Sequence, residues 1–283
     1  MDTKPLFSRL RLCLIGIGAL TFLALLLRTL ALFLAFDAEI GYFATGAAAR
    51  RSLVYLLYVT EIFGAAAVFA PLFSVRRDEL PTDRAPLSKV GSVGAGLCAF
   101  LFAAAAVFLL TKVSSLPCPA LLTVLAAICL AVGAAYFVLH FLDKTDKAPA
   151  CGFGVIFASA LLLSITYFDR YTPMNAPHKV ALHLCLLSVM LFMLYELRAL
   201  IGRPMPRALL VTSAICFFLC TVIGASDLIA FAARIYTDPL YFVIDLLVTG
   251  LALYVGSRAV CDLALLTKAP DAAAEMTSDD AAA

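Results

Sequence analysis

Tryptophan is missing from this sequence, and histidine and charged residues are scarce. The 283 residues include no Trp and 3 His, and Asp, Glu, Lys and Arg together make up 14%. A soluble domain usually carries about 25% charged residues. With 64% apolar residues and a mean hydropathy of +1.02, this low charge excludes an ordinary soluble domain and indicates an integral membrane protein in a lipid bilayer.

Common catalytic and ligand-binding motifs are also missing. The chain has no nucleophile elbow, no zinc-protease motif, no P-loop and no glycine-rich dinucleotide fingerprint. No paired-cysteine zinc spacing occurs, and the 9 Cys predict helix packing and not disulfides. A net charge of +2 without a basic stripe excludes a nucleic-acid partner. We therefore expect no cofactor and no metal, although His178, His183 and Asp169 form a set worth testing for a metal.

Long apolar runs organise the chain. Each is close to the roughly 20 residues that a helix needs to cross about 30 Å of hydrocarbon. The runs are too long and continuous for barrel strands, and the first is too long for a cleaved signal peptide. We therefore predict an all-α, polytopic integral membrane helix bundle with eight transmembrane helices. The runs cover 12–36, 53–75, 90–111, 119–142, 150–168, 180–201, 208–231 and 239–257.

Basic residues predict the orientation of these helices. Lysines and arginines concentrate at the N-terminus and in segments 76–89 and 198–207, which an even number of crossings places on one side. Because cytoplasmic loops are enriched in Lys and Arg, we predict a plasma (inner) membrane protein with both termini in the cytoplasm. Residues 1–269 then form a single transmembrane domain, and 270–283, rich in alanine and acidic residues, form a disordered cytoplasmic tail.

Two patterns bear on how the helices pack. Phe36-Asp37 and Phe168-Asp169 end the first and fifth runs in the same way, which raises a 4+4 parallel repeat as a hypothesis. Small residues at every fourth position of the third and fourth runs predict close packing of these two helices. The small residues are Gly91, Ala95, Ala99 and Ala103 in one helix and Ala127, Ala131 and Ala135 in the other.

Charged residues inside apolar runs are the strongest functional signal, because each costs at least about 2.5–3.5 kcal/mol at a helix centre. Arg28, Glu61, Asp227 and Asp245 lie about 6–12 Å from the outer ends of four different helices, at a rise of about 1.5 Å per residue. We predict that they line a water-accessible, mainly acidic pocket in the outer half of the bundle. The alternative is structural: Arg28 pairs with Glu61 to hold helices together, while Asp227 and Asp245 are hydrated near the surface.

Other polar residues border this region. The candidate substrate-binding residues are completed by Asp37 and Glu39 in the first outer loop and by Asp169, His178 and His183 around the start of the sixth helix. Glu196 and His140 are expected at the inner interface, where long side chains reach water. The outer tyrosines, Tyr236 and Tyr241 among them, are expected to form an aromatic belt.

Three functions fit these observations. The first is a transporter or permease-like protein for a small polar or cationic solute, which needs the fewest missing motifs. The second is a membrane enzyme that acts on a lipid-linked substrate, such as a polyprenyl-phosphate sugar, or on an outer-surface substrate, with Asp37 and Glu39 as its acids. The third is a non-catalytic accessory or scaffold subunit with a protein partner. The sequence leaves enzymatic activity undecided and favours transport.

Overall fold

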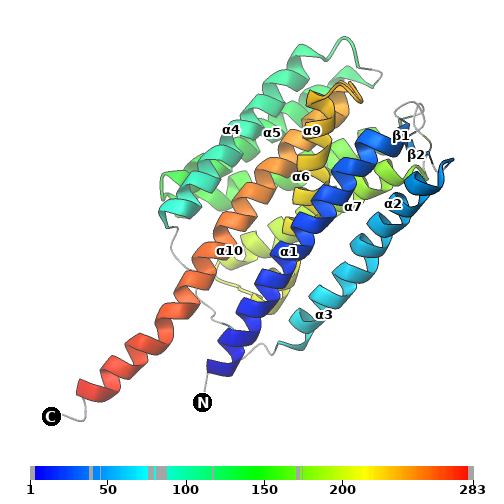
Figure 1. Ribbon diagram of the computed structural model, residues 1–283. Coiled ribbons are helices and arrows are strands. Elements are labelled where there is room, and N and C mark those ends of the chain that lie inside the picture. The colour runs from blue at the N-terminus through cyan, green and yellow to red at the C-terminus, as the bar shows by residue number, and fades with distance from the viewer. Residues whose placement is uncertain are drawn as a thin grey trace.

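The protein is almost entirely helical (Figure 1). The computed structural model describes residues 4–279, apart from 38–40, 45, 76–79, 81–87, 117, 170–172 and 174. The elements are α1 (Lys4–Ala35), β1 (Phe36–Asp37), β2 (Tyr42–Phe43), α2 (Ala48–Val59), the π-helical η1 (Thr60–Gly64), α3 (Ala65–Ser74), α4 (Lys89–Thr111), α5 (Ala120–Phe141), the 3₁₀-helical η3 (Thr145–Lys147), α6 (Ala148–Tyr167), α7 (Pro177–Leu200), α8 (Pro206–Cys220), the π-helical η4 (Thr221–Ala225), α9 (Ser226–Ala232) and α10 (Pro239–Asp279).

Within the described residues, eight helices are long and apolar enough to cross a membrane. This agrees with the number predicted from the apolar runs. Two of the eight are composite: α2, η1 and α3 form one continuous helix, and α8, η4 and α9 form another. The two ends of the chain lie at the same end of the bundle, and the β1–β2 hairpin lies at the opposite end (Figure 1). The 4+4 repeat stays a prediction.

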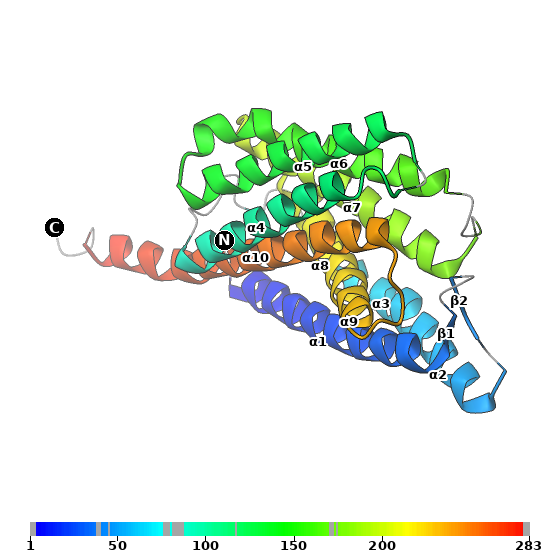
Figure 2. The same cartoon turned by 90° about the horizontal axis from the view of Figure 1, so that it is seen from above.

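The helices form two groups with a central layer between them (Figure 2). Helices α1, α2 and α3 lie together on one side, and α4 to α7 lie side by side on the other. Between these groups, α10 packs against α4, α8 and η4, while α9 packs against α1. The span of α10 is the most buried of the eight, which makes this helix the centre of the fold. Helix α10 continues to Asp279, into the segment from 270 onward for which the sequence predicts a disordered tail.

Local signals in the sequence explain where several helices begin and end. Helices α7, α8 and α10 start at Pro177, Pro206 and Pro239, where the missing N–H costs nothing because the first turn has no acceptor for it. Before α10, Oδ1 of Asp238 accepts hydrogen bonds from the backbone N–H groups of the first turn, at 2.8 and 3.4 Å. Gly202, with φ of +75°, ends α7 in a conformation that favours glycine.

The predicted packing face of α4 and α5 is only partly correct. The two helices do pack together, and Gly91, Ala95 and Ala99 are buried, but Ala103 is exposed. In α5, Ala127 is buried, whereas Ala131 and Ala135 are exposed. Gly133 lies against a phenylalanine of α4 and a valine of α6. A stripe every four residues drifts around an α-helix of 3.6 residues per turn, so its far end leaves the interface.

Large apolar side chains cover much of the outside of the bundle. Leu12, Phe100 and Leu121 are 72%, 67% and 71% exposed, and similar residues occur on most of the eight spans. An exposed apolar surface of this extent is unfavourable in water and suits the hydrocarbon of a lipid bilayer. The fold is therefore compatible with a multi-pass membrane protein.

Candidate functional site

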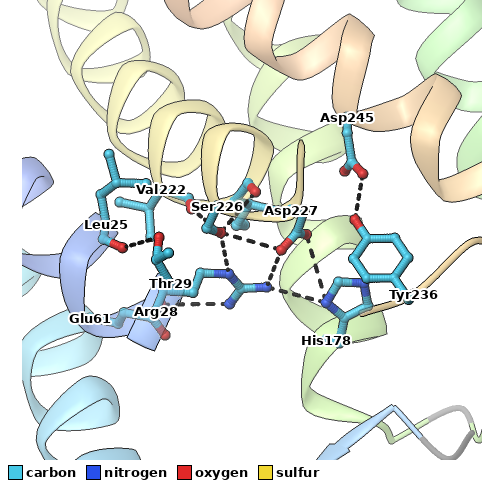
Figure 3. A network of polar contacts seen from close by, with 11 residues as sticks. Leu25, Arg28, Thr29, Glu61, His178, Val222, Ser226, Asp227, Tyr236 and Asp245 are labelled. Atoms are coloured by element: carbon cyan, nitrogen blue, oxygen red, sulfur yellow. Dashed lines mark hydrogen bonds and ion pairs between the residues drawn. The ribbon is translucent and has the colours of Figure 1, made fainter. Parts of the chain in front are cut away.

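A buried polar network lies where α1, η1, α7 and α9 meet, close to the hairpin (Figure 3). Arg28 reaches from α1 toward the first residues of α9, which follow the π-helical η4 directly. Five side chains contact one another through hydrogen bonds or ion pairs, and two more are joined to them through a ring contact. We call this group the outer network: Arg28, Glu61, His178, Ser226, Asp227, Tyr236 and Asp245.

Arg28 is the centre of the network and is 2% exposed. Its Nε donates a hydrogen bond to Oγ of Ser226 at 3.1 Å. Its Nη1 lies 3.7 Å from Oε1 of Glu61, and its Nη2 lies 3.6 Å from Oδ1 of Asp227. Both carboxylates are near enough for strong Coulomb attraction but beyond ordinary hydrogen-bond distance. The guanidinium is therefore neutralised by loose ion pairs and not by a bidentate clamp.

His178 lies between Arg28 and Asp227 and is 4% exposed. Its Nδ1 is 3.3 Å from Nη2 of Arg28 and 3.7 Å from Oδ2 of Asp227. A guanidinium only donates, so the first contact is a hydrogen bond only when Nδ1 is unprotonated. The second contact is attractive only when the ring carries a proton at Nδ1. Protonation of His178 therefore exchanges its partner, from Arg28 to Asp227.

Tyr236 and Asp245 extend the network toward α10. The hydroxyl of Tyr236, in the connection between α9 and α10, donates to Oδ2 of Asp245 at 2.6 Å. Burial raises the pKa of Tyr236 well above its ordinary value, and the negative charges of Asp227 and Asp245 raise it further. The phenol therefore stays protonated and remains a donor. The ring of Tyr236 also contacts that of His178, with centroids 5.7 Å apart, which links the two parts of the network.

Aromatic rings cover His178 on the hairpin side. Phe36 of β1 has its ring centroid 5.3 Å from that of His178, and Tyr241 of α10 lies at 5.4 Å. Phe36 also contacts the ring of Tyr236, at 6.4 Å. The hairpin is tied to the start of α7, because the Tyr42 hydroxyl donates to Oδ1 of Asn175 at 2.6 Å. His178 is thus covered by one ring from the hairpin and one from α10.

Both π-helical turns of the described chain lie at this network. Glu61 is the second residue of η1, and Ser226 and Asp227 follow the last residue of η4. A π turn adds one residue to the helical circuit and is frequent at functional sites. In η4 the released carbonyl groups are partly satisfied by the Ser226 hydroxyl, which donates to Val222 at 2.6 Å and Ile223 at 3.1 Å. The extra residue sets the direction in which Ser226 and Asp227 point.

The structure brings together most of the predicted intramembrane charges. Arg28, Glu61, His178 and Asp227 are in direct contact, and Asp245 joins them through Tyr236. The expectation that Asp227 and Asp245 are hydrated near the surface is wrong, because both are 0% exposed. The predicted water-accessible pocket is likewise not open in this conformation: apart from Glu61, whose side chain is 21% exposed, the charged side chains are enclosed by helices and aromatic rings.

The remaining predicted residues lie beside the network or outside the described chain. Asp37 lies on β1, paired with the strand residue Tyr42, and Glu39 falls outside the described residues. Nζ of the buried Lys179 donates to the backbone oxygen of Asp169 at 3.1 Å. His183 contacts Oγ1 of Thr166 through Nε2 at 3.0 Å. In the described part of the chain, no group of three or more His, Cys, Asp and Glu side chains is placed to hold a metal ion.

A second polar cluster lies toward the end of the bundle where the two chain ends are. Glu196 of α7 is 0% exposed, and its Oε1 accepts hydrogen bonds from Tyr254 of α10 at 2.9 Å and Tyr136 of α5 at 3.4 Å. His140 packs on the ring of Tyr136 with centroids 4.5 Å apart and is 1% exposed. The prediction that Glu196 and His140 reach the interface is therefore wrong. Both side chains point into the bundle, where tyrosine hydroxyls replace water.

The fold and the network define a class: an eight-span helical bundle, compatible with a membrane protein, with a buried arginine–carboxylate–histidine network near one end. Comparisons with protein-family models, with curated proteins and with solved structures give no match. The function is therefore argued from the geometry of the outer network.

Proposed function

We propose that the protein is a transporter or permease-like carrier for a small polar or cationic solute, with the outer network as its closed binding site. One observation carries the proposal. Arg28 has two carboxylate partners, Glu61 and Asp227, at 3.6–3.7 Å, and Oδ2 of Asp227 accepts no hydrogen bond from the described residues although it is buried. Buried polar groups that serve only to hold helices together are normally satisfied by close hydrogen bonds.

The loose contacts allow a cationic group of a solute to exchange with Arg28. An ammonium or guanidinium group that approaches Asp227 or Glu61 would replace the guanidinium of Arg28 without leaving a buried carboxylate unpaired. Breaking a buried ion pair without replacement costs about 3–5 kcal/mol, so exchange is far easier than separation. A protonated His178 would hold Asp227 during the exchange, since its Nδ1 is 3.7 Å from Oδ2.

The arrangement of the helices supports an opening motion. Arg28 and Glu61 belong to the group of α1, α2 and α3, whereas His178 belongs to the group of α4 to α7 and Asp227 to the layer between them. Movement of one group against the other would separate Arg28 from His178 and open the site. The π turns η1 and η4 interrupt regular α-helix within two of the moving spans. We further propose that the site faces the outer half of an inner membrane, with both termini cytoplasmic.

The test is electrogenic transport by the full-length protein in vesicles on a solid-supported membrane. The probes are concentration jumps of methylammonium, guanidinium, choline and a zwitterionic amino acid. We expect a saturable current with at least one probe, at least tenfold smaller in Asp227→Asn and Glu61→Gln. Asp143→Asn, at an exposed aspartate in the loop after α5, is the control and should keep the current.

Each variant is also checked for a single, monodisperse peak in size-exclusion chromatography. Equal currents in wild type and in both network variants would contradict the proposed site. Asp37→Asn is tested beside them, and a loss of current in this variant alone would place the solute site at the hairpin.

A further inference from the structure

Asp245 is only half satisfied. The carboxylate is 0% exposed, and its Oδ2 accepts the short bond from Tyr236. Its Oδ1 is buried and accepts no hydrogen bond from the described residues. A carboxylate oxygen in this condition needs a donor or a cation, because burial without one costs several kcal/mol. This oxygen is therefore open to a donor or to a cation.

Two buried hydroxyls, one on α10 and one on η4, are unsatisfied in the same way. Thr249 lies four residues after Asp245, on the same face of α10, and Thr221 is the first residue of η4. Their Oγ1 atoms are buried and have no hydrogen-bond partner among the described residues. A methyl group added at Gly224 would lie 2.6 Å from Oγ1 of Thr249, so this hydroxyl faces the backbone of η4 directly.

The unsatisfied hydroxyls of Thr221 and Thr249 differ from other hydroxyls in the helices of this protein. Hydroxyls of other helical residues bond to the carbonyl one turn earlier, as Thr29 does at 2.8 Å, Ser159 at 2.9 Å and Thr212 at 2.8 Å. Such a bond satisfies the hydroxyl within its own helix. Thr221 and Thr249 do not make it. Of the two, Thr249 lies one turn from Asp245 on the same face of α10, so its oxygen and the carboxylate can share a ligand.

The charge balance indicates the sign of that ligand. The network contains one guanidinium, that of Arg28, and three carboxylates, those of Glu61, Asp227 and Asp245. When all three carboxylates are ionised, two negative charges are left unbalanced. His178 contributes no charge while its Nδ1 accepts from Arg28. A monovalent cation beside Asp245 compensates one of the two charges.

We propose that a sodium ion binds between η4 and α10, on Oδ1 of Asp245 and the hydroxyl of Thr249. Carboxylate and hydroxyl oxygens are hard ligands suited to a hard cation, and a helix irregularity that meets a carboxylate is the kind of place where carriers bind coupling ions. Its role as a coupling ion rests on the proposed transport function, whereas the binding itself does not. Tyr236 connects the ion to the solute site, because it bonds Asp245 and packs on His178.

The test is binding of radioactive sodium to the purified full-length protein in detergent, at constant ionic strength with choline as the replacing cation. We expect saturable binding and a rise in the midpoint of thermal unfolding with sodium but not with potassium. Asp245→Asn should abolish both effects, and Thr249→Val should weaken sodium affinity about tenfold, equivalent to about 1.4 kcal/mol. Thr212→Val, whose hydroxyl bonds its own helix, is the matched control and should bind sodium like wild type.

Several results would overturn the sodium site. These are the absence of saturable binding in wild type, undiminished binding in Asp245→Asn, or an equal effect of potassium. Stabilisation by lowering the pH from 8 to 6 with no sodium bound would assign the site to a proton instead. If Asp245→Asn does not fold, the sodium affinities of Thr249→Val and Thr212→Val are compared instead. Equal affinities would exclude the Thr249 hydroxyl as a sodium ligand.

The outcomes separate this inference from the proposed function. If solute currents persist in sodium-free buffer and the protein binds no sodium, the proposed sodium site is contradicted but the proposed transport function is not. If the protein binds sodium but gives no solute current, the sodium site is supported and the proposed transport function is contradicted.

Discussion

Tyrosine–carboxylate bonds recur in both polar clusters, and their strengths differ in a way that can be measured. The hydroxyl of Tyr254 lies 2.9 Å from Oε1 of Glu196, while that of Tyr136 lies 3.4 Å from the same atom. A hydrogen bond to a charged group contributes about 1.5–3 kcal/mol, and the contribution falls with distance. Glu196 should therefore depend more on Tyr254 than on Tyr136.

Tyr254→Phe should lower the midpoint of thermal unfolding in detergent by several degrees and by more than Tyr136→Phe does. Differential scanning fluorimetry with a thiol-insensitive dye measures both variants against wild type. Both rings pack against Phe137, so the loss of hydroxyl and not of ring packing is compared. Equal midpoints for the two variants would show that the shorter bond has no special weight. The charged residues inside the membrane spans can be located from the sequence alone, because a charged residue within an apolar run stands out in the order of residues.

The partners of these charges were not visible. No pattern in the sequence marks Ser226, and Tyr236 is predicted to lie in an interfacial belt, yet both bond to members of the outer network. Glu196 was placed at the interface because it lies near the end of an apolar run, whereas the chain supplies it with two buried phenols. Which side chains meet depends on how α5, α7 and α10 rotate against one another, and no local pattern fixes that rotation.

Among the elements, the π turn η4 depends on a residue without a side chain. A methyl group added at Gly224 would lie 2.7 Å from Cγ2 of Val248 and 3.0 Å from the backbone nitrogen of Thr249. Backbone atoms cannot move aside as a flexible side chain does, so α10 and η4 must separate. Overpacking of this kind costs about 1–3 kcal/mol. Gly224→Ala should therefore lower the midpoint of thermal unfolding and, on the proposed function, the solute current.

Gly18→Ala is the matched control, because nothing lies within 4 Å of a methyl group added there. Alanine favours a helix over glycine by up to about 1 kcal/mol, so this variant should be as stable as wild type or slightly more stable. A Gly224→Ala protein as stable as Gly18→Ala would mean that η4 and α10 are not in close contact. The π turns themselves were beyond prediction: one extra residue per helix leaves the apolar run intact, so the runs locate the helices but not their internal irregularities.

For the whole molecule, the predicted orientation can be tested in intact cells with loops that flank α5. Ser115 and Lys144 are exposed residues at opposite ends of this region, before and after the helix. If both termini are cytoplasmic, a membrane-impermeant maleimide should label Ser115→Cys and should label Lys144→Cys only after permeabilisation. Wild type, with Cys118 half-buried, gives the background. The reverse pattern would invert the orientation and place the outer network on the cytoplasmic side.

The bonds between tyrosines and buried carboxylates also make the protein its own optical reporter. With 10 Tyr and no Trp, near-ultraviolet absorption arises mainly from phenols, free of the stronger indole signal. Tyr236 donates a hydrogen bond to Asp245, and Tyr136 and Tyr254 donate to Glu196. Each polar cluster therefore contains a phenol whose absorption spectrum shifts when the carboxylate that it bonds gains or loses charge. Difference spectroscopy on the unmodified chain, with Tyr236→Phe to assign the bands, can therefore follow events in the outer network without any added label.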